Sequence, residues 1–147
     1  MIRSAVAYRA NGTVIIASVV RTTMGVGLEV EPVVLSNTPD AESTARALAH
    51  ALAQSDRIVP HPSHHDWKAS FQPFLEAAGV RSLKAFMAGA QQVSIEAIAD
   101  QLKLTPSRNL GSKQGFEEMV NQAVLLSAND QSSAAASLLR MLEAPSG

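Results

Sequence analysis

The sequence has no cysteine in its 147 residues. Disulfide bonds, a thiolate nucleophile and zinc–thiolate sites are therefore excluded for this chain. A chain without cysteine fits a reducing compartment, and no apolar run approaches the roughly 18 residues that a membrane-spanning helix needs. The first residues, MIRSAVAYRANG, lack the long apolar core of a signal peptide. We therefore expect a cytoplasmic protein that does not bind a membrane.

An excess of charge of one sign is also missing. The 12 basic and 13 acidic residues leave a net charge of −1, which gives no support to direct nucleic-acid binding driven by bulk charge. Aromatic residues make up only 4% of the chain, but apolar residues reach 46%, which is typical of a globular protein. The length fits a single domain over residues 1–147.

Residues 61–90 predict a central block of short helices. Ser63 is a helix cap, Pro73 should kink or split the first helix, and Gly79 should end it. Ser82 then caps a second helix. This block contains four of the six aromatic residues of the chain, namely Trp67, Phe71, Phe74 and Phe86. Because aromatic side chains have a large apolar area, we expect the block, including Trp67, to fill the core.

The segments on both sides of this block predict strands. Alternating or β-branched residues indicate strands near 2–9, 13–20, 28–35, 91–98, 101–105 and 123–126. Asn11-Gly12 and Ala99-Asp100 predict hairpin turns, and residues 57–60 and 106–114 are expected to be connections without regular structure. One long helix should start at Thr38-Pro39, and another after Asn129 or Asp130. The pattern predicts an α/β (α+β) domain, with helices packed on a central, largely antiparallel sheet.

The two ends of the chain resemble each other. Val34-Leu35-Ser36 leads through a short turn to a helix with Ala45 and Leu48, and Leu125-Leu126-Ser127 leads in the same way to Ala135 and Leu138. Two explanations stay open. One is an internally duplicated unit of three strands and a helix, and the other is the frequent recurrence of a strand, a turn and an alanine-rich helix.

The histidines are the first candidates for chemistry. His61, His64, His65 and Asp66 are residue types that bind transition metals. However, neighbouring residues on a helix point about 100° apart, and the spacing does not match the HExxH motif. We expect an exposed or helix-capping cluster, with no bound metal and no cofactor. A small metal-binding or hydrolytic domain that uses these four residues is the alternative function.

Two other catalytic patterns do not occur. The glycine-containing segment RTTMGVG at residues 21–27 does not match the phosphate-binding loop GxxxxGK[ST] and leads into a strand. It therefore predicts a bulge or tight connection. The nucleophile elbow GxSxG is missing, so Ser63 beside His64 is interpreted as a helix cap.

Two pairs of carboxylates are candidate binding residues. Glu29 and Glu31 are two residues apart on a predicted strand, which would place them on one face. Glu117 and Glu118 follow a long polar segment, and binding residues are frequent in such regions. Acidic side chains resemble a nucleic-acid backbone in charge, so both pairs suit a basic partner. We rank Glu117 and Glu118 before Glu29 and Glu31.

A set of short motifs also follows a recognisable order over most of the chain. It comprises RTTMGVG at 21–27 with Glu31-Pro32; His61-Pro62-Ser63 with Trp67 and Pro73; LEAAGVRS at 75–82 with Phe86; Gly89-Ala90 with Val93-Ser94-Ile95-Glu96; Pro106-Ser107-Arg108-Asn109; and Gly115-Phe116. In this order the motifs resemble those of immunity proteins from bacterial contact-dependent growth inhibition systems. Glu117-Glu118 departs from the pattern, because apolar residues or proline are expected there.

The resemblance implies that the protein is not an enzyme. It implies one-to-one binding of the C-terminal toxin domain of a large surface-exposed effector, which is thereby blocked in the cytoplasm of the producing cell. The toxins of such systems are often nucleases, so a nuclease is the expected partner. Each immunity protein is matched to its own toxin, however, and the sequence does not give that toxin's activity. It leaves the oligomeric state open as well.

Overall fold

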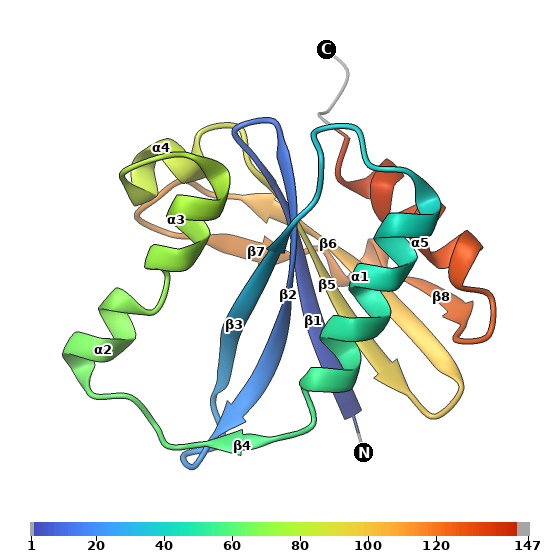
Figure 1. Ribbon diagram of the computed structural model, residues 1–147, viewed down its shortest axis with the longest axis horizontal. Coiled ribbons are helices and arrows are strands. Elements are labelled where there is room, and N and C mark those ends of the chain that lie inside the picture. Colours follow the sequence, from blue (N-terminus) through green and yellow to red (C-terminus); the bar gives the residue numbers. More distant parts are fainter. Residues whose placement is uncertain (1, 144–147) are drawn as a thin grey trace.

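The computed structural model describes residues 2–143, and in this range eight strands form one sheet (Figure 1). The strands are β1 (Ile2–Ala10), β2 (Thr13–Thr22), β3 (Gly27–Val34), β4 (Ile58–Val59), β5 (Gln91–Ile98), β6 (Gln101–Asn109), β7 (Phe116–Glu118) and β8 (Val124–Ser127). Their order is β3-β2-β1-β5-β6-β7, while β8 also pairs with β6 and the short β4 with β2. Only β4 pairs in parallel among the described strands. The predicted antiparallel sheet is therefore confirmed.

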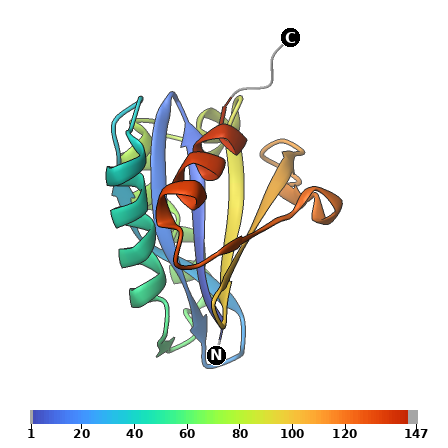
Figure 2. The ribbon, with the colours of Figure 1, turned by 90° about the vertical axis from the view of Figure 1, so that its right-hand side faces the viewer.

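The helices cover the two faces of this sheet unequally. They are α1 (Ala41–Gln54), α2 (His64–Ala69), α3 (Gln72–Ala78), α4 (Leu83–Met87) and α5 (Gln131–Met141), with a 3-10 turn at Val120–Gln122. Helices α1 and α5 lie side by side on one face (Figures 1 and 2). On the other face, α3 and α4 pack over β1, β2 and β3. No helix in the described range is long and apolar enough to cross a membrane.

Each face of the sheet has its own apolar core. The core under α1 and α5 includes Ala7, Ile16, Leu48, Ile95, Leu104 and Leu138, all of them buried. The core under α3 and α4 includes Val6, Tyr8, Ile15, Ala17, Phe74 and Phe86. Burial of apolar area on both faces is the main source of stability. Both cores are built on the same sheet, so the predicted single α+β domain is confirmed.

The turns that shape the sheet follow from local sequence. Asn11 and Gly12 both have positive φ, at 50° and 73°, as a two-residue turn of type I′ requires. At β3 the register slips, because Glu31 and Pro32 together lie opposite one residue of β2. Glu31 has φ 56°, so β3 contains a bulge at Glu31 and Pro32.

The two ends of the chain also share a topology. Each unit has a hairpin, a third antiparallel strand and a helix that returns to the same face, namely β1-β2-β3-α1 and β5-β6-β8-α5. Asp40 and Asp130 cap the two helices alike, with Oδ1 accepting from the backbone N of Ser43 at 2.7 Å and of Ser133 at 3.1 Å. Strands β1 and β5 pair antiparallel between the units, as a two-fold rotation requires. The topology favours the internal duplication.

The central block confirms some predictions and contradicts one. Ser63 and Ser82 cap α2 and α4, and Gly79 has φ 72° after α3. Pro73 splits the run into two helices. The prediction that Trp67 is buried is wrong, because its side chain is 36% exposed and stacks on His61 with 5.5 Å between ring centroids. The split turns α2 away from the sheet (Figure 1). Trp67 therefore does not pack on the sheet as the buried residues of α3 do.

Three predicted boundaries are also wrong. Asp40, and not Thr38, caps α1. Residues 57–60 contain β4, and the segment predicted as a loop after Thr105 continues β6 to Asn109. A proline normally interrupts a strand because it lacks the N–H donor. Pro106 is tolerated because it lies between the part of β6 that pairs with β8 and the part that pairs with β7, and its carbonyl still accepts from the Met119 backbone N at 2.8 Å.

Alanine substitutions of Phe74 and Trp67 should destabilise the protein to different extents. Phe74→Ala should lower the free energy of unfolding by about 3–5 kcal/mol, the usual range for a large aromatic residue in a core, because Phe74 is fully buried. Trp67→Ala should cost only about 1 kcal/mol, the value of one aromatic pair. Urea unfolding followed by circular dichroism measures both. Equal losses would contradict the surface position of Trp67.

Candidate functional site

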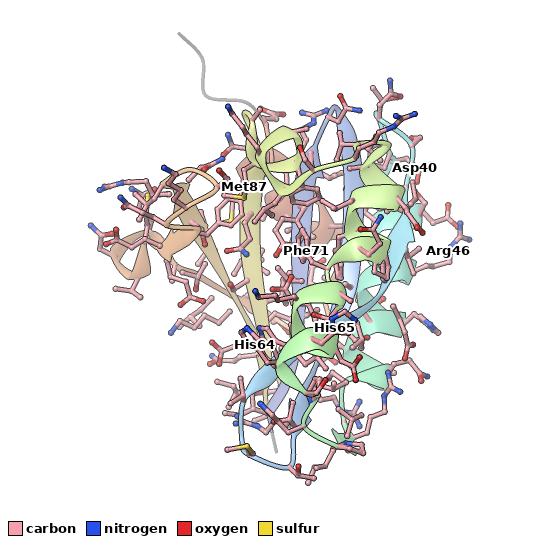
Figure 3. The ribbon with its side chains drawn as sticks, turned by 90° about the vertical axis from the view of Figure 1, so that its left-hand side faces the viewer. Asp40, Arg46, His64, His65, Phe71 and Met87 are labelled. Atoms are coloured by element: carbon pink, nitrogen blue, oxygen red, sulfur yellow. The ribbon has the colours of Figure 1, made fainter. Side chains whose placement is uncertain are left out.

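The face of the sheet under α3 and α4 is only partly covered, and beside these helices it forms an open cleft. The cleft has a volume of about 650 Å³. Its lining comes from β1 (Ser4, Val6, Tyr8), β2 (Val19, Arg21), β3 (Gly27, Glu29), β5 (Gln92, Ser94, Glu96) and β7 (Phe116, Glu118). Phe71 and Met87 border it from the helical side (Figure 3). We take this cleft as the candidate site.

A chain of hydrogen bonds crosses the floor of the cleft. The Tyr8 hydroxyl donates to Oε1 of Glu29 and accepts from Nε2 of Gln92 at 3.1 Å. Oε1 of Gln92 in turn accepts from Oγ of Ser107 at 2.8 Å. These four residues come from β3, β1, β5 and β6. This series of side-chain hydrogen bonds therefore connects the edge strand β3 to the centre of the sheet.

Aromatic rings fix the position of Tyr8. Its ring makes edge contacts with Phe71, Phe74 and Phe86 at centroid distances of 6.1, 6.0 and 5.3 Å. Phe116 of β7 adds a tilted contact at 5.9 Å. Edge-to-face pairs at such distances are favourable beyond the burial of their area. The hydroxyl of Tyr8 is consequently held at one place in the cleft.

Burial determines the protonation of the two partners. It raises the pKa of Tyr8 well above the ordinary value of 10.0, and the charge of Glu29 raises it further. Burial also raises the pKa of Glu29 above 4.5, while the hydrogen bond from Tyr8 acts in the opposite direction. Tyr8 therefore keeps its proton at neutral pH and acts as a hydrogen-bond donor, whereas Glu29 acts as an acceptor.

The lining has an excess of negative charge. It contains three carboxylates, Glu29, Glu96 and Glu118, and one basic side chain, Arg21, a balance of −2. The ion pairs of the described residues, Arg46–Glu42 and Arg57–Glu31, involve none of these four. An open cleft with this balance attracts positively charged groups.

The structure separates the predicted pair Glu29 and Glu31. Glu29 lines the cleft, whereas Glu31 forms an ion pair with Arg57, whose Nε also donates to the Gln54 carbonyl at the end of α1. Helix α1 lies on the opposite face of the sheet. The prediction of one shared face is wrong, because the positive φ of Glu31 interrupts the alternation of side chains.

The second pair is separated as well. Glu117 and Glu118 lie in β7, opposite Arg108 and Ser107 of β6. Adjacent residues of a strand point to opposite faces. Only Glu118 lines the cleft. The structure thus brings one member of each predicted pair to the same site.

The histidines do not converge. His61 lies before α2, where its Nδ1 is 2.9 Å from Oγ1 of Thr22 and its ring stacks on Trp67. His64 and His65 are exposed in the first turn of α2 (Figure 3). Between residues 2 and 143, no three His, Asp or Glu side chains are close enough together to hold a metal ion. The alternative of a metal-binding or hydrolytic domain gains no support from this geometry.

Comparison with known proteins finds the fold but no sequence relative. No family model and no curated protein matches the chain. A protein of unknown function from Neisseria meningitidis has 18% identity and a TM-score of 0.77, covering 97% of this chain and 93% of that one. A chain of the CdiA-CT/CdiI toxin and immunity complex from Yersinia pseudotuberculosis has 10% identity and a TM-score of 0.76, covering 97% and 95%. At such identities the likeness shows the fold alone.

The raised pKa of Glu29 predicts a dependence of stability on pH. The folded state binds this proton more tightly than the unfolded chain, whose pKa has the ordinary value of 4.5. The contribution of Glu29 is therefore fully present below that pH and is lost as the pH rises through the folded pKa. Glu29→Gln retains an acceptor for Tyr8 but removes the titration. The melting temperature of the wild type, relative to Glu29→Gln, should fall as the pH rises from below 4.5. A constant difference would contradict the raised pKa.

The double variant His64→Ala/His65→Ala tests the histidine cluster. Both side chains are exposed, and surface substitutions usually change stability by less than about 0.5 kcal/mol. We expect an unchanged melting temperature and no stoichiometric zinc in the purified wild type by elemental analysis. Zinc that is present in the wild type and lost in the double variant would overturn this prediction.

Proposed function

We propose that this protein is an immunity protein that binds and neutralises the C-terminal toxin domain of a contact-dependent growth inhibition effector. The observation that carries the proposal is the likeness of fold, over nearly the whole of both chains, to a chain of a toxin and immunity complex. The order of short motifs along the sequence supports the same family independently. The likeness of fold does not depend on the sequence motifs, because at 10% identity the two structures are matched by their backbone geometry.

The open cleft is the proposed docking site for the toxin. An uncovered sheet face in an otherwise packed domain is free for a partner, and the cleft offers polar groups that are already fixed in place. Glu29 and Glu118 are the proposed binding residues among the predicted four. Apolar side chains near them include Leu83, which is 45% exposed, and the rings of Phe71 and Phe116. This combination of polar and aromatic groups is typical of specific interfaces.

In this proposal, protection comes from occupancy and involves no chemistry by the immunity protein. One copy covers one toxin domain in the cytoplasm of the producing cell, through an interface of about 1,200–2,000 Å² in total. The cleft alone is smaller than such an interface, so exposed residues around its rim also contribute. Because the net charge is only −1, attraction of a basic toxin such as a nuclease depends on the local acidic lining.

Co-purification tests the function. The neighbouring gene should encode a large adhesin-like protein, and its C-terminal domain should co-elute with this chain as a one-to-one complex of matching mass. Expression of that domain alone should stop growth, and co-expression of this protein should restore it. Failure of the two purified proteins to associate would refute the proposal.

Charge reversal locates the docking face. Glu118→Lys places a positive charge in the cleft and should weaken toxin binding by at least about tenfold, or about 1.4 kcal/mol. Glu117→Lys is the matched control, because it makes the same change at the next residue on the opposite face, and should alter binding by less than about threefold. Isothermal titration calorimetry measures both. Equal effects would place the toxin elsewhere.

A further inference from the structure

Glu29 is a carboxylate inside the cleft without a positively charged partner. Its hydrogen bond within the described residues is the one that Oε1 accepts from Tyr8. Arg21 lines the same cleft but is not within ion-pair distance of it. Glu31, two residues along the same strand, does have its cation in Arg57. On the same strand, therefore, the carboxylate of Glu31 is neutralised by a cation within the protein and that of Glu29 is not.

The second oxygen of Glu29 is accessible from the cleft. Oε2 accepts no hydrogen bond from the residues that the structure describes. In the same range, no fully buried side-chain oxygen or nitrogen lacks a partner, so Oε2 must reach solvent. A carboxylate that is largely removed from water and bonded on one oxygen is costly to keep charged. Its raised pKa reflects this cost.

The position of this carboxylate is fixed before any partner arrives. Tyr8 holds Oε1 in place, the ring of Tyr8 is held by phenylalanine edges, and Gln92 and Ser107 hold its hydroxyl from the other side. An acceptor that is already ordered loses little entropy when a ligand binds. The arrangement is that of a receptor for a hydrogen-bond donor that approaches through the cleft.

The internal duplication indicates what kind of group the cleft accepts. When the hairpin turns Asn11-Gly12 and Ala99-Asp100 are superposed, the positions of Val6, Tyr8, Ile15 and Ala17 correspond to those of Ser94, Glu96, Lys103 and Thr105. The first set packs under α3 and α4. The second set is polar: Ser94 and Glu96 line the cleft, and Thr105 is buried. An apolar helix does not suit such a surface, but a charged side chain with polar neighbours does.

We infer that Glu29 receives one lysine or arginine side chain of the partner, which donates to Oε2 while Tyr8 keeps its bond to Oε1. Glu118, in the same lining, adds negative charge around the incoming cation, whereas Glu96 lies directly opposite Lys103 on β6. A charge-assisted hydrogen bond in a partly buried site is stronger than one in water. The inference rests on the proposed function only for the identity of the partner, the toxin domain.

A small cation tests the receptor without any toxin. N-acetyl-argininamide is titrated into the purified protein at pH 7, and the backbone amide shifts of Gln92 and Ser94 are followed by NMR. The shifts should saturate in the wild type and in the matched control Glu31→Gln. They should show at least about tenfold weaker binding in Glu29→Gln, and none with neutral N-acetyl-citrullinamide. Equal binding by Glu29→Gln and the wild type would overturn the inference.

A second measurement needs no variant. The carboxyl carbon of Glu29, labelled with ¹³C in the wild type, reports its own titration. A bound cation favours the charged form, so the probe should move this titration to lower pH. An unchanged titration at saturating probe would overturn the inference even if Glu29→Gln failed to fold.

The toxin domain separates the two proposals. Glu29→Gln should weaken the complex by at least about tenfold and Glu31→Gln by less than about threefold. If the toxin binds wild type and Glu29→Gln equally, the immunity function stands and the receptor role of Glu29 is wrong. If the probe binds at Glu29 but no toxin domain associates with the protein, the receptor stands and the proposed function is wrong.

Discussion

Polar side chains that are buried in a sheet face need hydrogen-bond partners within the protein, and the bonds from Ser107 through Gln92 and Tyr8 to Glu29 supply them on the second face. The chain of bonds begins at β6, crosses the two central strands and ends on the edge strand β3. It passes under the boundary between the covered and uncovered halves of the face. The second core, the cleft and the position of Glu29 all depend on where these bonds hold Tyr8.

The duplicated architecture explains why the molecule has one open region. On the first face the two units contribute equivalent helices, α1 and α5, which pack against each other and complete a core (Figure 2). On the second face only the first unit is followed by covering helices in the described range. The uncovered area belongs to the second unit, and the equivalent area of the first unit is buried under α3 and α4. Polar residues at its positions allow it to stay exposed, and its incomplete cover makes it available to a partner.

Local features of the fold could be predicted because they depend on a few adjacent residues. The Asn11-Gly12 turn, the serine caps and the glycine after α3 follow from the conformations that these residues prefer. Trp67 could not be placed in this way, because its burial depends on where α2 lies after the split at Pro73. Trp67 shares a helical spacing of three and four residues with Phe71, Phe74 and Leu75 only if one continuous helix is assumed.

The site itself was less predictable than the fold. Glu29 and Glu118 were named from sequence, but for reasons that the structure corrects. The bulge in β3 places Glu31 on the other face from Glu29, and the alternation of side chains along β7 places Glu117 on the other face from Glu118. Tyr8 and Gln92 are 84 residues apart in sequence, and nothing local to either indicates the pairing. Only the antiparallel register of β1 and β5 brings them together.

The bulge at Glu31 and Pro32 has a consequence for the solubility of the protein. Strand β3 is an edge strand, and the outer row of backbone groups on such a strand can template the addition of strands from other molecules. Pro32 provides no N–H, and the left-handed backbone at Glu31 breaks the outer row into two short runs. A charged side chain stands at the same point. This edge is therefore protected against the growth of intermolecular sheets, even when the chain accumulates at high concentration.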